Sequence, residues 1–353
     1  MKTLNELLET SFKCGASDIF IISGIPVSYK HSESIKQIDD EKVTPPLAQK
    51  LIEEIYAAGK RELSHLYETG DDDFSFAIAG LSRFRVSTYK QRGSLAAVIR
   101  IIPFGIPNYK ELNIPEQVMA AAEKIKGLVI VAGPAGSGKS TTLACIIDRI
   151  NETKSGHIIT LEDPIEYLHI NKKSIISQRE IYIDSRNYIT ALRACLRQAP
   201  DVILLGEMRD HETIKTAMTA AETGHLVIST LHTVGAANTI DRIIDVFPPE
   251  QQRQIRVQLS MILQSVISQQ LMPDVNGNSV PCFEVMNVNN AIRTMIRDSK
   301  TYQIDSVISS SASEGMMSMD TELLKLFKNG RIDRETAIRY ASNIELMIKK
   351  TNI

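Results

Sequence analysis

The amino-acid sequence predicts an α/β protein with a small α+β domain followed by a doubly wound α/β domain built on a parallel sheet. Three observations lead to this prediction. In the later part of the chain, short and almost continuous apolar runs alternate with helical patterns, which is typical of parallel strands buried on both faces. In the earlier part, polar and apolar residues alternate, as in half-buried antiparallel strands. A proline-containing stretch separates the two parts.

The first domain, residues 1–105, is predicted to begin with a helix at 4–14. A strand at 17–22 follows and stops at Gly24 and Pro26, because glycine and proline commonly end regular structure. The remaining elements of this domain are a helix at 46–58 and strands at 73–78, 83–89 and 95–102.

Pro103, Pro107 and Pro115 punctuate the next stretch, and repeated proline disfavours both helices and central strands. We therefore place a linker at 106–114 and the second domain at 115–353. The predicted strands of this domain are 128–132, 157–161, 202–205 and 226–230, and its predicted helices are 140–151, 185–198, 210–223 and 250–271. The last helix is predicted from an apolar stripe that runs from Ile255 to Ile267.

The overall composition is that of an ordinary globular protein, with 43% hydrophobic and 23% charged residues. Because 40 Lys and Arg residues nearly balance 42 Asp and Glu residues, we expect no direct binding of nucleic acid. The N-terminus lacks a signal-peptide core, and no apolar run approaches the roughly 18–20 residues that span a bilayer. These features predict a cytoplasmic protein that reaches a membrane only through partners.

The segment that follows the strand at 128–132 matches the pattern G-x-x-x-x-G-K-[ST], and a helix leaves it. Small residues allow backbone N–H groups to surround phosphate oxygens at a helix N-terminus. The pattern predicts ATP binding, with Lys139 on the β- and γ-phosphates and the Ser140 hydroxyl on Mg²⁺. The predicted nucleotide-binding residues are Gly133, Pro134, Ala135, Gly136, Ser137, Gly138, Lys139, Ser140 and Thr141.

Carboxylates follow two other predicted strands. Glu207 comes after the strand at 202–205, and Glu162 and Glu166 come after the strand at 157–161. Ligands of parallel sheets bind at the carboxyl ends of the strands, so these side chains are expected near the phosphate loop. One of them can activate the attacking water, and Glu207 can hold Mg²⁺ directly or through water. The sequence does not divide these roles, although Glu207 together with Glu166 is slightly favoured.

Two histidines and several arginines complete the set of candidates. His225 and His232 bracket the strand at 226–231, where an imidazole can hydrogen-bond phosphate or a neighbouring carboxylate. The first domain carries arginines at 83, 85, 92 and 100, and positive charge from outside the phosphate loop commonly stabilises the transition state of phosphoryl transfer.

Four segments occur in an order that resembles the secretion-ATPase superfamily, with its Walker A, Asp-box, Walker B and His-box motifs. They are 133–140, 162–166, 206–210 and 223–233. Further stretches are similar to the type IV pilus retraction ATPases, the PilT-like branch, at 220–225, 239–248, 291–297 and 315–320. From the residues alone, 291–297 is an amphipathic basic helix; the branch uses the matching segment for retraction.

The resemblance implies a ring of six identical subunits, each with a PAS-like N-terminal domain and a RecA-like, P-loop NTPase domain after it. It implies that ATP lies between the two domains of a subunit, that Arg85 and Arg100 approach its phosphates, and that an inner-membrane pilus platform protein is the partner. The location implied is the cytoplasmic side of the pilus base. Phe20 stands where the family often has histidine, and Val234-Gly235 replaces a small polar pair.

Other functions remain open at this point. A pilus-extension, type II secretion or conjugative-transfer ATPase of the same superfamily is disfavoured because no C-x-x-C pair is present, whereas those relatives typically carry a tetracysteine zinc site. A RecA-like DNA translocase is disfavoured by the balanced charge and by the absence of Trp for base stacking. A nucleotide-dependent scaffold without hydrolysis is disfavoured by the crowded carboxylates.

Overall fold

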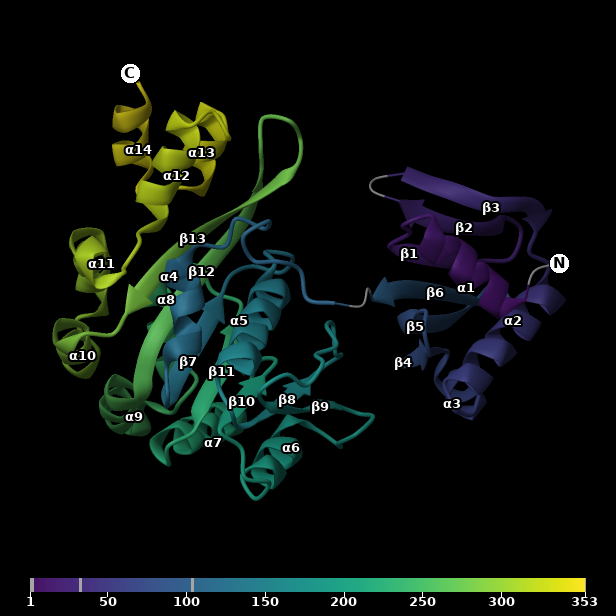
Figure 1. Ribbon diagram of the computed structural model, residues 1–353, viewed down its shortest axis with the longest axis horizontal. Helices are drawn as coiled ribbons and strands as arrows, with labels where there is room; N and C mark the ends of the chain where they lie inside the picture. Colours follow the sequence, from purple (N-terminus) through teal and green to yellow (C-terminus); the bar gives the residue numbers. More distant parts are fainter. Residues whose placement is uncertain (1–2, 32–33, 103–104, 353) are drawn as a thin grey trace. The chain divides into compact units, whose positions relative to one another are not determined.

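The computed structural model describes residues 3–31, 34–102 and 105–352. The chain divides into two compact units, 1–105 and 106–353 (Figure 1), and each is described by itself. Pro103, at the start of the proline-containing stretch, lies outside the described residues. Ile106, Tyr109 and Leu112, in the segment predicted as a linker, pack against the core of the second unit.

The first unit is a six-stranded antiparallel sheet with the strand order β3-β2-β1-β6-β5-β4, accompanied by three helices. Its elements are α1 (Leu4–Lys13), β1 (Asp18–Ile21), β2 (Pro26–His31), β3 (Ser34–Lys42), α2 (Pro45–Ala58), α3 (Ser64–Thr69), β4 (Asp71–Ile78), β5 (Ser82–Gln91) and β6 (Ser94–Ile102). The sequence did not predict β2 and β3. Most of β3 is exposed, so it lacks the alternation by which a half-buried strand is recognised.

The second unit contains a seven-stranded sheet with the order β13-β12-β7-β11-β10-β8-β9. All neighbouring strands are parallel except β12 and β13. The strands are β7 (Gly127–Ala132), β8 (His157–Glu162), β9 (Ile175–Glu180), β10 (Val202–Leu205), β11 (Leu226–Leu231), β12 (Leu263–Pro273) and β13 (Ser279–Asn287). This arrangement confirms the predicted α/β class with a parallel sheet.

Two hydrophobic cores lie on the two faces of this sheet. On β7, Leu128 and Ile130 belong to one core and Val129 and Val131 to the other, because successive side chains of a strand point to opposite faces. Helices α4 (Glu116–Met119) and α5 (Lys139–Thr153) contribute to the core of Val129. The opposite core contains residues of α6 (Tyr188–Cys195), α7 (His211–Glu222), α8 (Ala236–Asp245), α9 (Pro249–Ile262), α10 (Asn290–Arg297) and α11 (Ile304–Ser310).

Three further helices cover the end of the β12–β13 pair, as Figure 1 shows: α12 (Met319–Lys328), α13 (Arg334–Tyr340) and α14 (Ile344–Thr351). Met272 and Cys282 of the two strands share a small core with these helices. Short 3₁₀ turns occupy Ala120–Glu123, Thr301–Gln303 and Ala312–Glu314.

The predicted helix at 250–271 is wrong in its second half. Helix α9 ends at Ile262, and the next residue, Leu263, is extended and begins β12. Val266 and Ile267, which the sequence analysis placed on one helical stripe, lie in the two opposite cores. Pairing with β7 on one side and β13 on the other therefore overrides the helical periodicity, which a strand buried on both faces also satisfies.

Helix α10 holds the end of α9. The side chain of Arg293 donates from Nη1 to the carbonyl oxygens of Ser260 and Met261, at 2.6 and 2.9 Å. The last carbonyl groups of a helix have no partner within the helix, so this arginine satisfies two of them. The apolar side of α10 is buried through Ile292 and Ile296.

Candidate nucleotide site

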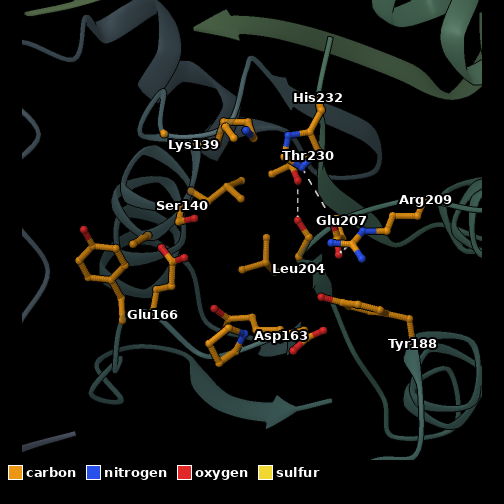
Figure 2. Close-up of a pocket in the computed structure, with 18 of the residues that line it drawn as sticks. Lys139, Ser140, Asp163, Glu166, Tyr188, Leu204, Glu207, Arg209, Thr230 and His232 are labelled. Carbon is orange, nitrogen blue, oxygen red and sulfur yellow. Dashed lines mark hydrogen bonds and ion pairs between the residues drawn. The ribbon is translucent and has the colours of Figure 1, made fainter. Parts of the chain in front are cut away.

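The candidate site lies at the carboxyl edge of the parallel sheet, where four strands end. Strand β7 leads into the phosphate loop, β8 into the segment with Glu162 and Glu166, β10 into Glu207, and β11 into His232. Residues from all four segments line one cavity of about 280 Å³ (Figure 2). The parallel direction of the strands brings these groups together, as the sequence analysis expected.

The phosphate loop has the backbone that its glycines permit. Gly136 and Gly138 have φ angles of 77° and 85°, which side-chain-bearing residues rarely adopt, and Gly138 is the N-cap of α5. At Gly133 a Cβ atom would lie only 2.2 Å from the carbonyl oxygen of Gln269. The loop is therefore pressed against β12 as well as being curled at the positive N-terminus of α5.

Lys139 is buried, and its ammonium group is held by the loop itself. Nζ donates to the carbonyl oxygens of Gly133 and Pro134, both at 2.9 Å. Burial lowers the pKa of Lys139, and the nearby Glu166 and Glu207 carboxylates oppose that shift. The cation is thus stored beside the cavity with weak carbonyl partners that phosphate oxygens can replace.

A polar residue of β12 supports the loop from behind. The hydroxyl of Thr142 donates to Oε1 of Gln269 at 2.7 Å, and Nε2 of the same side chain would lie 2.9 Å from a Cβ at Gly138. Gln269 is buried. The sequence analysis missed this residue because it assigned Gln269 to a helix.

The other loop residues have different surroundings. Pro134, Ala135 and Gly136 are exposed, whereas the Ser137 hydroxyl is buried without a hydrogen-bond partner among the described residues. Thr141 shares a hydrogen bond of 2.8 Å with the hydroxyl of Tyr167, which lies on the segment after β8.

Ser140 and Glu207 line the same cavity, and Figure 2 shows them on opposite sides of it. Within the described ranges, no group of three or more His, Cys, Asp or Glu side chains could hold a metal ion by itself. Mg²⁺ in phosphate-transfer sites is usually held by one or two protein ligands together with substrate phosphates. A hydroxyl and a carboxylate across one cavity fit that pattern.

Glu162, at the end of β8, is half-buried. Its Oε1 accepts hydrogen bonds from Oγ1 of Thr160 at 2.6 Å and from Nε2 of Gln178 at 3.2 Å. Burial raises the pKa of Glu162 to about 7, although both hydrogen bonds favour the charged form. Glu166, in contrast, is exposed at the mouth of the cavity.

Glu207 lies among polar groups of three elements. Oε1 is 2.7 Å from Nε of Arg209, and Oε2 is 3.8 Å from Nε2 of His232. Its side chain is 13% exposed, whereas that of Arg209 is 74% exposed. Figure 2 places Tyr188 beside this group, and the pKa of its hydroxyl is raised by burial and by the surrounding carboxylates, Glu207 first. The carboxylate is thus oriented by an arginine and faces the imidazole.

The structure separates the two histidines. His232 lines the cavity, but His225 precedes β11 and lies at its other end, roughly 20 Å away for a strand of six residues. Nδ1 of His225 is 3.0 Å from the carbonyl oxygen of Ala220, and the residue lines a different cavity of about 350 Å³. Within one chain, His225 and the phosphate loop therefore lie at opposite edges of the sheet, because the two ends of a strand reach opposite edges, and a catalytic role for His225 stays a prediction.

Arg85 and Arg100 belong to the first unit, where they lie opposite each other on β5 and β6. Nε of Arg100 is 2.9 Å from Oδ1 of Asp18. Their approach to the phosphates stays a prediction.

No helix among the described residues is long and apolar enough to cross a membrane. A sequence model of the family described as "Type II/IV secretion system protein" matches residues 1–331. The chain is 44% identical over 336 residues to the "Type IV pilus retractation ATPase PilT" of Pseudomonas aeruginosa, which covers 95% of this chain and 96% of the relative. A "Twitching motility protein" of Neisseria gonorrhoeae is 49% identical over 276 residues, 78% of this chain and 74% of the relative.

The fold has a similar counterpart among solved structures, "Crystal Structure of the Pilus Retraction Motor PilT and Bound ADP". The two share 44% sequence identity and a TM-score of 0.92, over 99% of this chain and 100% of the other. Sequence and fold therefore agree along nearly the whole length, and the chain belongs to the type II/IV secretion system protein family, in its branch of PilT-like pilus retraction ATPases.

Proposed function

We propose that this chain hydrolyses ATP to ADP and phosphate and uses the energy to retract a type IV pilus. One observation carries the ATPase part: four strand ends bring a phosphate loop, three glutamates and a histidine to one cavity. The names of the similar proteins, which refer to pilus retraction and twitching motility, support the pilus part.

Each group has a task that follows from its place. The backbone N–H groups of the loop and the start of α5 bind the phosphates, and Lys139 exchanges its two carbonyl partners for β- and γ-phosphate oxygens. Ser140 and Glu207 would hold Mg²⁺, which when bound neutralises charge on the phosphate oxygens. Thr141 lies in the first turn of α5 and links that helix to the segment after β8 through its hydrogen bond with Tyr167.

Activation of the water belongs to the glutamates. Glu207 is oriented by Arg209 and faces His232, so it can accept a proton from water while the imidazole contacts the γ-phosphate. Glu166 reaches the cavity from the other side. Glu162 also lines the cavity, half-buried, and its carboxylate interacts electrostatically with that of Glu166.

The mechanical part rests on the two-unit organisation. Six copies would form a ring on the cytoplasmic side of the pilus base, and Arg85 and Arg100 would approach the phosphates when ATP draws a first unit onto a second. Release after hydrolysis, repeated around the ring, would turn an inner-membrane platform protein and disassemble the pilus. Contact with membrane or nucleic acid is not part of this proposal.

The test is fluorescence microscopy of pili in a strain that lacks the gene, complemented with the natural chain or with Glu207→Ala. We expect long, non-retracting pili in the deletion strain, restored retraction with the natural chain, and no restoration with the variant. Cells without pili would instead assign the chain to extension. Restored retraction by Glu207→Ala would contradict the site.

A further inference from the structure

The segment between β8 and β9, residues 163–174, carries Glu166 and Tyr167 and has several attachments to the rest of the unit, two of which are separate clusters of side-chain hydrogen bonds. One attachment lies on β9, beside the candidate site. The other lies on α5, away from the phosphate loop. Substitutions at one attachment or the other can therefore distinguish an effect on the stability of the segment from an effect on the orientation of the site residues.

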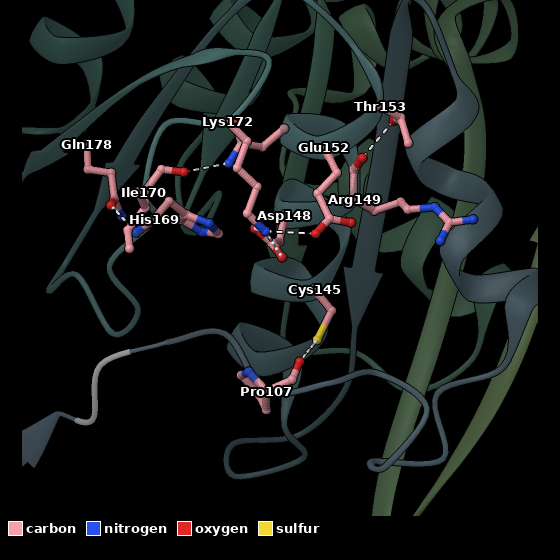
Figure 3. Close-up of polar contacts among 11 residues, drawn as sticks. Pro107, Cys145, Asp148, Arg149, Glu152, Thr153, His169, Ile170, Lys172 and Gln178 are labelled. Carbon is pink, nitrogen blue, oxygen red and sulfur yellow. Dashed lines mark hydrogen bonds and ion pairs between the residues drawn. The ribbon is translucent and has the colours of Figure 1, made fainter.

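The attachment on β9 is the side chain of Gln178. In the parallel pairing of β8 and β9, Gln178 stands opposite Thr160. Its Oε1 accepts from the backbone N–H of His169 at 2.8 Å, as Figure 3 shows, and its Nε2 donates to the carbonyl oxygen of Tyr167 at 2.8 Å. The second hydrogen of Nε2 is directed at Oε1 of Glu162, at 3.2 Å. Both donors and the acceptor of one amide are therefore used.

These contacts make Gln178 a bridge between a carboxylate and a backbone. Thr160 and Gln178 donate to the same oxygen of Glu162, so the two paired strands together fix the direction of that carboxylate. The other bonds of Gln178 hold the backbone directly after Glu166, and Tyr167 continues the chain of contacts to Thr141 on the phosphate-binding helix. The Glu162 side chain and the backbone next to Glu166 are thus held by the same amide group, that of Gln178.

The attachment on α5 is made by Lys172 and Asn151. Nζ of Lys172 donates to both carboxylate oxygens of Asp148 at 2.9 Å and to Glu152 at 2.8 Å (Figure 3). The buried Asn151 side chain donates to the carbonyl oxygen of Ile170 and accepts from the N–H of Lys172. None of these bonds reaches a residue of the catalytic set.

We propose that Gln178 is a positioning residue for ATP hydrolysis, which holds Glu162 and the Glu166 segment in one fixed geometry toward the bound nucleotide. The inference rests on the proposed ATPase function. It assigns the Lys172 cluster a different role, which is to stabilise the fold of the same segment. Gln178 itself does not touch the nucleotide, so its effect on hydrolysis passes through the two glutamates.

The experiment compares Gln178→Met with Lys172→Met in the full chain, by phosphate release over a range of ATP concentrations and by thermal unfolding. Loss of hydrogen bonds to a charged group predicts that kcat of Gln178→Met falls about tenfold or more. KM should stay within about twofold because the phosphate loop is intact. Lys172→Met should lower Tm, with kcat within about twofold of the natural chain.

A second variant keeps the test informative if Gln178→Met does not fold. Gln178→Glu preserves the size of the side chain and the acceptor for His169 but removes both donors, so the same loss of kcat is expected with the segment still attached. Natural kcat in a folded Gln178 variant would overturn the inference, as would an equal fall of kcat in Lys172→Met. Absence of hydrolysis in the natural chain would instead overturn the proposed function.

Discussion

The two edges of the parallel sheet in the second unit contain similar groups, a cavity, a histidine and a lysine, but differ in the number of carboxylates. Each edge has a cavity, of about 280 and about 350 Å³, a histidine next to β11 and a lysine at one end of α5. At the carboxyl edge these residues are His232 and Lys139. At the amino edge they are His225 and Lys154, and Nζ of Lys154 donates to the carbonyl oxygen of Lys124 at 2.6 Å.

The difference is in the carboxylates. Three glutamates and Asp163 line the cavity at the carboxyl edge, whereas Asp201 is the acidic residue that lines the other cavity. The Asp201 carboxylate is engaged by the backbone N–H of His157 at 2.8 Å. Helix α5 begins at the carboxyl edge, where its positive N-terminus attracts anions, and ends at the amino edge. Strand and helix direction therefore decide which edge can process phosphate.

The largest expected effect comes from the two lysines. Lys139→Ala should reduce phosphate release at saturating ATP by about 10³-fold, because a cation that develops its contacts on the transferred phosphoryl group is lost. Lys154→Ala removes a partly buried ammonium group and should keep turnover within about twofold, with a lower Tm from the lost hydrogen bond to Lys124. Comparable turnover of Lys139→Ala and the natural chain would refute the assignment of the loop.

The next effect concerns the acidic groups. Glu207→Gln keeps the shape of the side chain but cannot accept a proton, so turnover should fall about 10²-fold while nucleotide binding persists. Asp201→Asn preserves an acceptor for His157 and should leave turnover unchanged. Steady-state phosphate release and titration with a fluorescent nucleotide measure the two quantities. A strong loss in Asp201→Asn would show that the amino edge takes part in hydrolysis.

Substitution of the two histidines should give a smaller difference in turnover. His232→Ala should lower kcat about tenfold, the usual scale for one hydrogen bond to a charged group. His225→Ala removes a side chain that contacts the end of α7 and should cost stability rather than turnover. Parallel assays of kcat and Tm on the two variants check this. Equal loss of turnover would mean that the amino edge serves the site of another copy in an assembly.

The smallest effect is on stability. The pKa of Glu162 is about 7 in the folded chain, above its ordinary value of 4.5, because burial disfavours the charged form. The stability associated with the protonated group is full below about pH 4.5 and is lost as the pH rises through about 7. Glu162→Gln should flatten this decline, by about 3 kcal/mol between pH 4.5 and 7, measured as Tm at several pH values.

Glu284 provides the control for that measurement. It is buried outside the cavity, accepts from the backbone N–H of Ala236 at 2.8 Å, and also has a pKa raised to about 7 by burial. Glu284→Gln should flatten the same pH window without a loss of the hydrolytic step. If neither variant changes the slope, burial of these carboxyls does not control the pH dependence of stability.

The carboxyl edge was largely predictable because its signals are local. The phosphate loop is a contiguous pattern, and Glu207 and His232 come within two residues of the ends of two short, largely apolar strands, β10 and β11. The position of His225 at the amino edge was also predictable, since two residues that flank one strand of a parallel sheet must lie at opposite edges. That consequence was not drawn from the sequence.

The supporting residues were not predictable in the same way. Gln269 contacts Thr142, 127 positions away in the chain, and Gln178 contacts Glu162 and the Tyr167 backbone through the register of two strands. The residues next to either glutamine in the sequence do not indicate which distant residues its side chain will contact. The same holds for β12, whose helical reading fails only because β7 and β13 stand on either side of it.

The direct junction of α9 with β12 has a mechanical consequence. No loop separates Ile262 from Leu263, so the helix passes directly into the strand, whose pairing with β7 has one irregularity between Leu263 and Ser265. Arg293 of α10 contacts the end of the helix, and Gln269, about 20 Å further along the strand, touches the phosphate loop. A close-packed interior yields little, so a push or pull on α10 is transmitted to the floor of the loop as a displacement rather than absorbed on the way.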